Sequence, residues 1–271
     1  MPFHLAALIS AVLCFAAWRI RAITAGGAVA AFTVGLAVLV GTGWDGGAVL
    51  MAFFVTSTAV GRAAEPWRAA RHVRPAFANL GPAPEGKGET RDQFQVIANG
   101  GAALLGALVG LATDQPALGL RIVTCSLAVA AADTWATSVG AVSQSAPRDI
   151  LSGQYVPPGA SGGITAVGTL GGALGALVVA VTGAVAGEAA GLLGVAFVIG
   201  FTGMLLDSVL GASVQGRFRC PACDVETERR RHRCGTRTVA IAGWGWLTND
   251  GVNLVATTVG AMAGWLVYRG G

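Results

Sequence analysis

Two aspartates stand inside long apolar stretches of this sequence, where a carboxylate is costly. Asp133 lies in Ala-Ala-Asp-Thr-Trp-Ala-Thr-Ser, followed by Thr134, and Asp207 lies in Leu-Leu-Asp-Ser-Val-Leu, followed by Ser208. An aspartate inside a membrane helix costs about 2.5–3.5 kcal/mol and is a functional candidate by default. The alternative interpretation is a structural hydrogen bond between helices.

Further polar side chains recur at the starts and ends of other apolar stretches, often one helical turn apart. Helix capping explains the first polar residue of such a stretch but not a second amide one turn further in. Four stretches would therefore bring polar groups to the same end, and this convergence carries more weight than any single motif. The residues are Gln95, Asn99, Gln215, Asn249, Asp250 and Asn253.

A glycine-rich segment, 157–163, reads Pro-Pro-Gly-Ala-Ser-Gly-Gly and leads into an apolar stretch. Free backbone N–H groups before a helix N-terminus suit phosphate binding, although a plain turn explains the segment equally well. Arginine side chains bind phosphates through paired hydrogen bonds. The candidate phosphate contacts are Gly159, Ser161, Gly162, Gly163, Arg91 and Arg148.

A cluster of soft ligands follows Asp207 in the segment 214–249. Cys220-Pro-Ala-Cys223 and His232-Arg-Cys234 supply four ligands with the spacing of a zinc knuckle. We predict structural zinc here, with unmetallated thiols as the alternative. The arginine run 229–233 suits a loop on the cytoplasmic side and could also contact nucleotide phosphates or anionic headgroups.

The elements that position these residues must be membrane helices. The chain of 271 residues is 54% hydrophobic and only 12% charged, about half the charged fraction of a soluble domain. Its apolar stretches are nearly unbroken, whereas transmembrane strands alternate apolar and polar residues. We expect an all-α, polytopic transmembrane bundle that forms a single domain over residues 1–271. The net charge of +4 is a weak reason to expect nucleic acid as a partner, and we expect none.

Eight spans are predicted, with seven or nine as alternatives because the first and third are short for a membrane core of about 30 Å. Gly-x-x-x-Gly pairs such as Gly168/Gly172 favour their close packing. Eight spans place sixteen of the eighteen basic residues on one side, which the positive-inside rule assigns to the cytoplasm. Both termini would then lie outside, and the loops 62–95, 143–163 and 214–249 would be cytoplasmic. The predicted spans are 3–18, 24–43, 46–61, 96–113, 117–142, 164–186, 189–213 and 250–268.

The order of these motifs resembles an integral membrane family that contains the plastid phytyl-phosphate kinase of vitamin E synthesis and transmembrane protein 19. The likeness rests on Arg-Asp-Gln-Phe-Gln-Val-Ile-Ala-Asn (91–99), Ala-Asp-Thr-Trp-Ala-Thr-Ser-Val-Gly (132–140), Val-Pro-Pro-Gly-Ala-Ser-Gly-Gly-Ile-Thr (156–165), Asp-Ser-Val-Leu-Gly-Ala-Ser-Val-Gln (207–215) and Asn-Asp-Gly-Val-Asn (249–253). It covers nearly the whole chain.

The resemblance implies a kinase that converts an isoprenoid monophosphate, of prenyl or phytyl type, to the diphosphate with a nucleoside triphosphate. The family's relation to CTP-using lipid enzymes suggests CTP as the donor. Asp133 and Asp207 would hold Mg²⁺, with Thr134 and Ser208 beside them. Two residues depart from the family pattern: Ser138 replaces an acidic residue, and Ala160 replaces a threonine.

Two other functions remain open at this point. A transporter for a small solute or a lipid could use the Asp-Thr and Asp-Ser pairs as halves of an internal repeat, although transporter sites usually lie at the bilayer midplane. A cytidylyltransferase that forms a CDP-lipid would need the same metal and nucleotide contacts. We expect a prokaryotic plasma-membrane protein whose active face is cytoplasmic.

Overall fold

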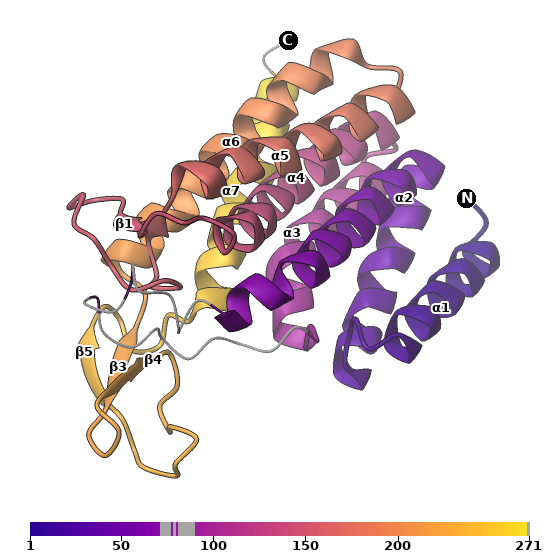
Figure 1. Cartoon of the computed structure of the whole chain (residues 1–271). Coiled ribbons are helices and arrows are strands. Elements are labelled where there is room, and N and C mark those ends of the chain that lie inside the picture. The colour runs from indigo at the N-terminus through magenta and orange to yellow at the C-terminus, as the bar shows by residue number, and fades with distance from the viewer. Residues whose placement is uncertain (71–76, 78–79, 81–89, 270–271) are drawn as a thin grey trace.

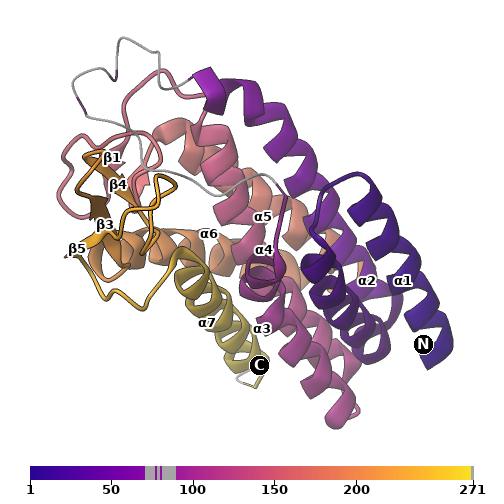
Figure 2. The ribbon, with the colours of Figure 1, turned by 90° about the horizontal axis from the view of Figure 1, so that it is seen from below.

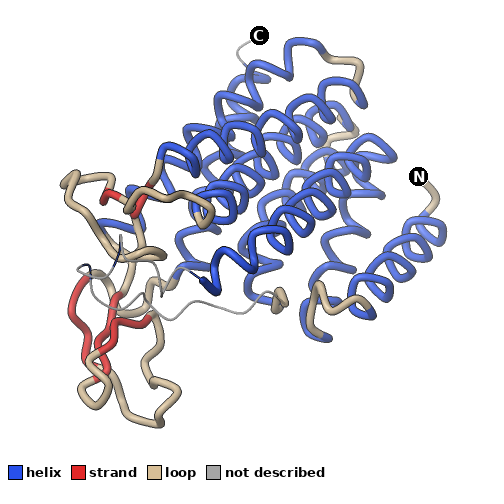
Figure 3. Tube along the Cα trace, viewed as in Figure 1, coloured by secondary structure: helices blue, strands red, loops and turns tan. Residues whose placement is uncertain are grey.

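The apolar stretches fold into helices, and short strands form in their connections (Figures 1 and 3). The computed structural model describes residues 1–70, 77, 80 and 90–269. The helices are α1 (Phe3–Arg19), α2 (Ala25–Ala70), α3 (Gln93–Ala112), α4 (Pro116–Gly140), α5 (Ala166–Ala186), α6 (Ala190–Ser213) and α7 (Asn249–Arg269). The strands are β1 (Arg148–Asp149), β2 (Gly163–Ile164), β3 (Arg217–Cys220), β4 (Val225–Thr227) and β5 (Val239–Ala242).

Helix α2 consists of two arms that meet at Gly43. The backbone there has φ 67° and ψ −151°, a conformation that glycine adopts without strain. A Cβ atom added at Gly47 would lie 2.7 Å from the Leu39 side chain, which is eight residues earlier. A straight helix would separate these residues by about 12 Å, so the chain turns back at Gly43. The two arms correspond to the predicted spans 24–43 and 46–61, but the second continues to Ala70.

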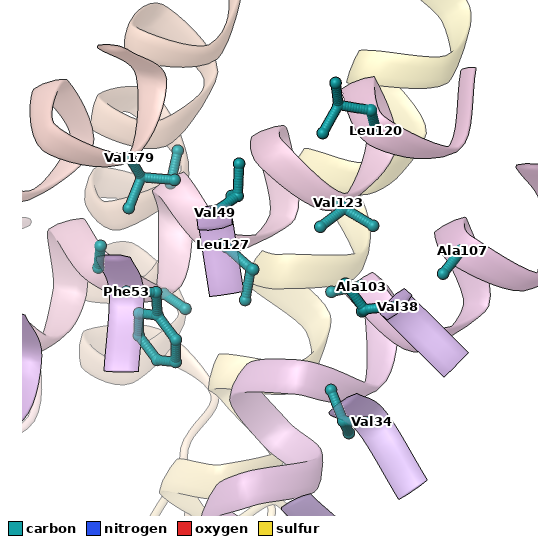
Figure 4. Close-up of a cluster of buried hydrophobic side chains, with 13 residues drawn as sticks. Val34, Val38, Val49, Phe53, Ala103, Ala107, Leu120, Val123, Leu127 and Val179 are labelled. Carbon is teal, nitrogen blue, oxygen red and sulfur yellow. The ribbon is translucent and has the colours of Figure 1, made fainter. Parts of the chain in front are cut away.

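Helix α4 is the centre of the bundle and packs against α2, α3, α5, α6 and α7. All its residues from Leu118 to Ala132 except Arg121 are buried. Val123 and Leu127 belong to a hydrophobic cluster that joins α4 to α2, α3 and α5 (Figure 4). The polar end of α4, which begins at Asp133, therefore directly follows a segment that other helices enclose.

Small residues allow α5 to lie directly on the backbone of α4. A Cβ atom at Gly168 would lie 2.8 Å from the Ala136 carbonyl oxygen, and one at Gly175 would lie 2.7 Å from that of Ala131. No larger side chain fits this contact. The Gly-x-x-x-Gly spacing thus serves helix packing, as predicted.

The predicted fold class is confirmed: the chain is a mostly helical bundle, and α2 to α6 are long and apolar enough to span a membrane. Described parts of the three long loops gather at one end of the bundle, and both termini lie at the other (Figures 1 and 2). The segment 214–249 also forms an antiparallel sheet of order β4-β3-β5, which we did not predict. Lys87, Arg71 and Arg74 lie outside the described residues.

Candidate functional site

A cavity of about 590 Å³ opens at the end of the bundle where the long loops gather. Residues of α2, α3, α4, α5, α6 and α7 line it, together with the loop 143–163 and Glu228. Its described lining carries four arginines and four carboxylates and contains no lysine, histidine or cysteine. The formal charges of these side chains therefore balance. The two aspartates come from α4 and α6, whereas the arginines come from the α1–α2 connection, α2 and the residues just before α3.

The acidic side of the cavity, by which we mean Asp133, Asp207, Asn249 and Asn253, comes from α4, α6 and α7. The carboxyl groups of Asp133 and Asp207 lie within hydrogen-bonding distance of one another. The amide of Asn253, oriented by its hydrogen-bonding network, donates to Asp207 Oδ1 over 2.7 Å. Two carboxyl groups this close either share a proton, which leaves one of them neutral, or need a cation between them.

The basic side of the cavity is formed by Arg21, Arg62, Arg68 and Arg91. Arg68 Nη2 donates to the buried Ser138 Oγ on α4 over 2.8 Å and also pairs with Glu65 at 3.8 Å. Arg62 Nη2 donates to the carbonyl oxygen of Ile20 over 2.6 Å, which ties the second arm of α2 to the end of α1.

Arg91 is held on this side by aromatic and hydroxyl neighbours. Its guanidinium lies 5.8 Å from the ring centre of Phe53 and 5.7 Å from that of Phe54. Arg91 Nη1 also donates to Thr58 Oγ1 over 3.3 Å. Burial lowers the pKa of Arg91 to about 10, so the side chain remains charged at neutral pH. A fixed, half-buried cation of this kind suits an anionic ligand.

The glycine loop, residues 157–163, closes the cavity against α6. Gly162 has φ +78°, and a Cβ atom there would lie 2.4 Å from that of Ala212. Ser161 Oγ accepts a hydrogen bond from Gln215 Nε2 over 2.9 Å, and the same amide donates to Glu228 Oε1 over 2.7 Å. The loop, the end of α6 and the sheet of segment 214–249 therefore meet in one hydrogen-bonded group.

Most of the predicted site residues line this one cavity. Gln95 also has a structural role, because it forms a reciprocal capping box with Asp92 at the start of α3. The lining residues that the sequence singled out are Arg91, Gln95, Asn99, Asp133, Thr134, Gly159, Ser161, Gly162, Gly163, Asp207, Ser208, Gln215, Asn249 and Asn253.

Two predicted contacts, Arg148 and Asp250, are not among the residues that line the cavity. Arg148 is exposed at β1, where Nη1 donates to the Gly153 carbonyl oxygen and Nη2 to the Tyr155 hydroxyl. Its guanidinium also lies 4.1 Å from the Tyr155 ring centre. These contacts hold Arg148 within its own loop.

Comparison with known proteins fits this membrane architecture. A family model described as integral membrane protein DUF92 matches residues 8–261. The chain belongs to this family.

Two relatives of this DUF92 protein come from distant organisms. Protein PGR of Arabidopsis thaliana is 24% identical over 276 residues, which cover 93% of the chain and 91% of the plant protein. The uncharacterized membrane protein MJ0933 of Methanocaldococcus jannaschii is 28% identical over 178 residues, covering 66% of the chain and 63% of that protein. No solved structure matches the chain.

Sequence reasoning missed part of the basic side of this DUF92 protein and two of the four carboxylates in the lining, Glu65 and Glu228. Arg21, Arg62 and Arg68 were counted only as positive charges of loops, because nothing in their spacing separates them from other arginines at span ends. Glu228 was missed because it adjoins an arginine run. Ser57, which is buried and lines the cavity, gave no signal within its apolar stretch.

The Cys/His cluster lies outside the cavity, on the sheet. Potential ligand atoms of Cys220, Cys223, His232 and Cys234 all lie within 4.8 Å of one another. Cys220 Sγ is 3.6 Å from Cys234 Sγ, and His232 Nδ1 is 3.1 Å from Cys234 Sγ. Four ligands around zinc at about 2.0–2.3 Å have similar separations, so the cluster could bind a metal ion.

Proposed function

We propose that this DUF92 protein is a membrane-embedded kinase that transfers a phosphoryl group from a nucleoside triphosphate, CTP in the first instance, to an isoprenoid monophosphate. The observation that carries the proposal is that one cavity is lined both by a contacting pair of carboxyl groups, Asp133 and Asp207, and by four arginines. Phosphoryl transfer depends mainly on positioning the phosphates and on balancing their charge. A cavity that opens at the end of a helical bundle suits a substrate with an anionic head and an apolar tail.

The acidic side fits a divalent cation. Its donors are oxygen atoms, and the contact between the carboxyl groups of Asp133 and Asp207 calls for a positive charge between them. We assign Mg²⁺ to these two aspartates, with Thr134 and Ser208 one residue further along each helix. When bound, magnesium supplies the positive charge that neutralises the phosphates of the donor.

The basic side would hold phosphate groups. Arg91 keeps its charge, and its contacts with Phe53, Phe54 and Thr58 limit its rotation, which favours a defined phosphate position. Arg68 is held in the same way by Ser138. The glycine loop would add backbone donors on the side of α6.

No general base is needed for this reaction. The acceptor is a phosphate monoester, which is already ionised at neutral pH and attacks the terminal phosphorus of the donor. A new bond forms between that phosphorus and the acceptor oxygen, and the bond to the bridging oxygen of the donor breaks.

The direct test incubates the purified protein with Mg²⁺, CTP or ATP and a panel of prenyl monophosphates, with products identified by mass spectrometry. Formation of a prenyl diphosphate together with a nucleoside diphosphate would support the proposal. A CDP-lipid together with pyrophosphate would instead identify a cytidylyltransferase. Absence of any product with every donor and acceptor would contradict both enzymatic functions.

We also propose that the cavity faces the cytoplasm of a prokaryotic plasma membrane, because the loops around it carry most of the basic residues. Ser152 is exposed in the loop 143–163, and Thr113 is exposed at the opposite end of the bundle. A membrane-impermeant thiol reagent added to intact cells should label Thr113→Cys but not Ser152→Cys. Labelling of Ser152→Cys alone would reverse the orientation.

The third part of the proposal is structural zinc at Cys220, Cys223, His232 and Cys234. The ligand set of three cysteines and one histidine is typical of closed, structural zinc sites. Strand β4 of the sheet that it would stabilise ends at Thr227, next to Glu228, which contacts the glycine loop. Zinc would thus fix the position of Glu228 without taking part in phosphoryl transfer.

A further inference from the structure

The segment 214–249 exposes large apolar side chains, from β5 to the residues just before α7, that the proposed kinase reaction does not use. We call this group the aromatic edge. It comprises Val239, Ile241, Trp244 and Trp246, which are 59%, 42%, 54% and 69% exposed. The two indoles stack with ring centres 5.6 Å apart and planes inclined by 17°. None of the four residues lines the cavity.

The backbone fixes the aromatic edge at the level where two helices end. The Trp244 N–H donates to the carbonyl oxygen of Val214, the residue that caps α6, over 2.8 Å. The Gly216 N–H donates to the Leu247 carbonyl oxygen over 2.8 Å, and Trp246 is only three residues before Asn249, where α7 begins. If α6 and α7 cross the membrane, the two tryptophans lie where helices leave it, at the depth at which tryptophan is enriched in membrane proteins.

Positive charge accompanies this edge. The segment 214–249 contains seven arginines and three acidic residues, a net charge of +4 that equals the net charge of the whole chain. The rest of the protein is therefore neutral overall. Arg230 Nη2 donates to the Gly245 carbonyl oxygen over 3.0 Å, which brings one guanidinium to the backbone between the two tryptophans.

We propose that the aromatic edge, together with the arginines of segment 229–237, is seated in the headgroup layer of the protein's own membrane, where it contacts anionic phospholipids. Three observations favour lipid over a protein partner: the attachment of the aromatic edge to the ends of α6 and α7, the excess of arginine, and the hydrogen bond of Arg230 beside the indoles. Basic residues close to a membrane are attracted to anionic headgroups, and indole rings prefer the interface. This inference does not depend on the kinase activity.

Tryptophan fluorescence in lipid nanodiscs tests the inference with the full chain. The spectrum of the Trp244→Phe, Trp246→Phe double variant is subtracted from that of the unaltered protein, which isolates the two indoles from the other tryptophans. Phospholipids brominated near the headgroup should quench this difference signal, and aqueous iodide should quench it much less. Strong quenching by iodide with no effect of the brominated lipid would overturn the proposal.

Two further experiments identify what the aromatic edge contacts. Nanodiscs that contain phosphatidylglycerol should protect the difference signal from iodide better than nanodiscs of phosphatidylcholine alone. That gain should disappear when Arg229, Arg231 and Arg233 are replaced by glutamine, whereas Arg19→Gln, at an exposed site on α1, should retain it. The two indoles could instead be protected from both quenchers only when a nanodisc contains two protein copies. That result would show that a second chain covers the aromatic edge and would overturn the lipid assignment.

Discussion

The acidic and basic sides of the cavity differ in how the fold holds them. Asp133 and Asp207 are fixed on α4 and α6, two neighbouring helices whose packing leaves little freedom at this depth. The arginines come from the α1–α2 connection, the end of α2 and the residues just before α3. Arg21 and Arg62 are exposed, whereas Arg68 and Arg91 are partly buried.

This difference indicates how each side tolerates substitution. The acidic side has two carboxylates in contact, so removal of either changes the charge of the pair and the number of its donors. The basic side has four cations at separate positions, so its neighbours retain part of the attraction for phosphate when one is lost. We therefore expect larger effects from single substitutions on the acidic side.

The largest effect should come from Asp133→Asn and Asp207→Asn. Each replacement keeps the size of the side chain and its hydrogen bonding but removes a charged oxygen ligand, so phosphoryl transfer should fall by orders of magnitude while the fold is retained. Steady-state kinase turnover and thermal unfolding in detergent measure the two properties. Asp114→Asn, exposed between α3 and α4 at the opposite end, is the matched control. Wild-type turnover in both cavity variants would refute the proposed mechanism.

The acidic side could be predicted from sequence because its residues stand out against their surroundings. A carboxylate among leucines and alanines is unusual, and this contrast alone singles out Asp133 and Asp207. The same contrast defined the helices, because long apolar stretches with so few charges are typical of membrane spans. Helix α2 shows the limit of predicting helix bounds in this way. The two predicted spans implied the turn at Gly43, but they did not predict that α2 extends to Ala70.

The basic side could not be predicted from sequence in the same way. Arginines at the ends of membrane helices are expected for reasons of topology, and only the fold distinguishes those that face a cavity. Sequence reasoning grouped Arg91 with Arg148, which the structure separates, and overlooked Arg68, which bonds to Ser138 across helices. The position of Glu228 depends on the sheet of segment 214–249, and no apolar periodicity in the sequence predicts that sheet.

Arg91, which lines the cavity, can be compared directly with Arg148, which does not. A hydrogen bond to a charged group contributes about 1.5–3 kcal/mol, so Arg91→Gln should raise the KM for a phosphate-bearing substrate by roughly 10- to 100-fold. Arg148→Gln removes the same charge from a residue outside the cavity lining and should change KM by less than about threefold, since exposed charges contribute little. Equal effects of the two variants would show that long-range charge, not the position of Arg91, attracts the substrate.

A smaller effect is expected at the glycine loop. Gly162 and Gly153 both have positive φ, and an added methyl group costs about 1 kcal/mol of backbone strain at either position. Only at Gly162 would the methyl group also collide with Ala212, whereas nothing lies within 4 Å at Gly153. Gly162→Ala should therefore lower kcat/KM about tenfold, with Gly153→Ala close to wild type. Similar losses in both variants would attribute the effect to strain alone.

The smallest effect should follow loss of the metal at the Cys/His cluster, which touches neither side directly. Cys220→Ser should remove about one zinc ion per chain by elemental analysis, whereas Cys14→Ser, on α1, should retain it.

Without zinc, the sheet would hold Glu228 less firmly against Ser161 and Gln215, and turnover should fall by a few-fold because the aspartates and arginines stay in place. Glu228→Gln separates the two steps of this argument. If zinc acts through Glu228, this variant should lose the same few-fold turnover while it keeps its zinc. Full activity of metal-free protein, or full zinc content in Cys220→Ser, would contradict the proposed role of zinc at this site. Gln215 and Glu228 would then join the segment 214–249 to the glycine loop without help from a metal.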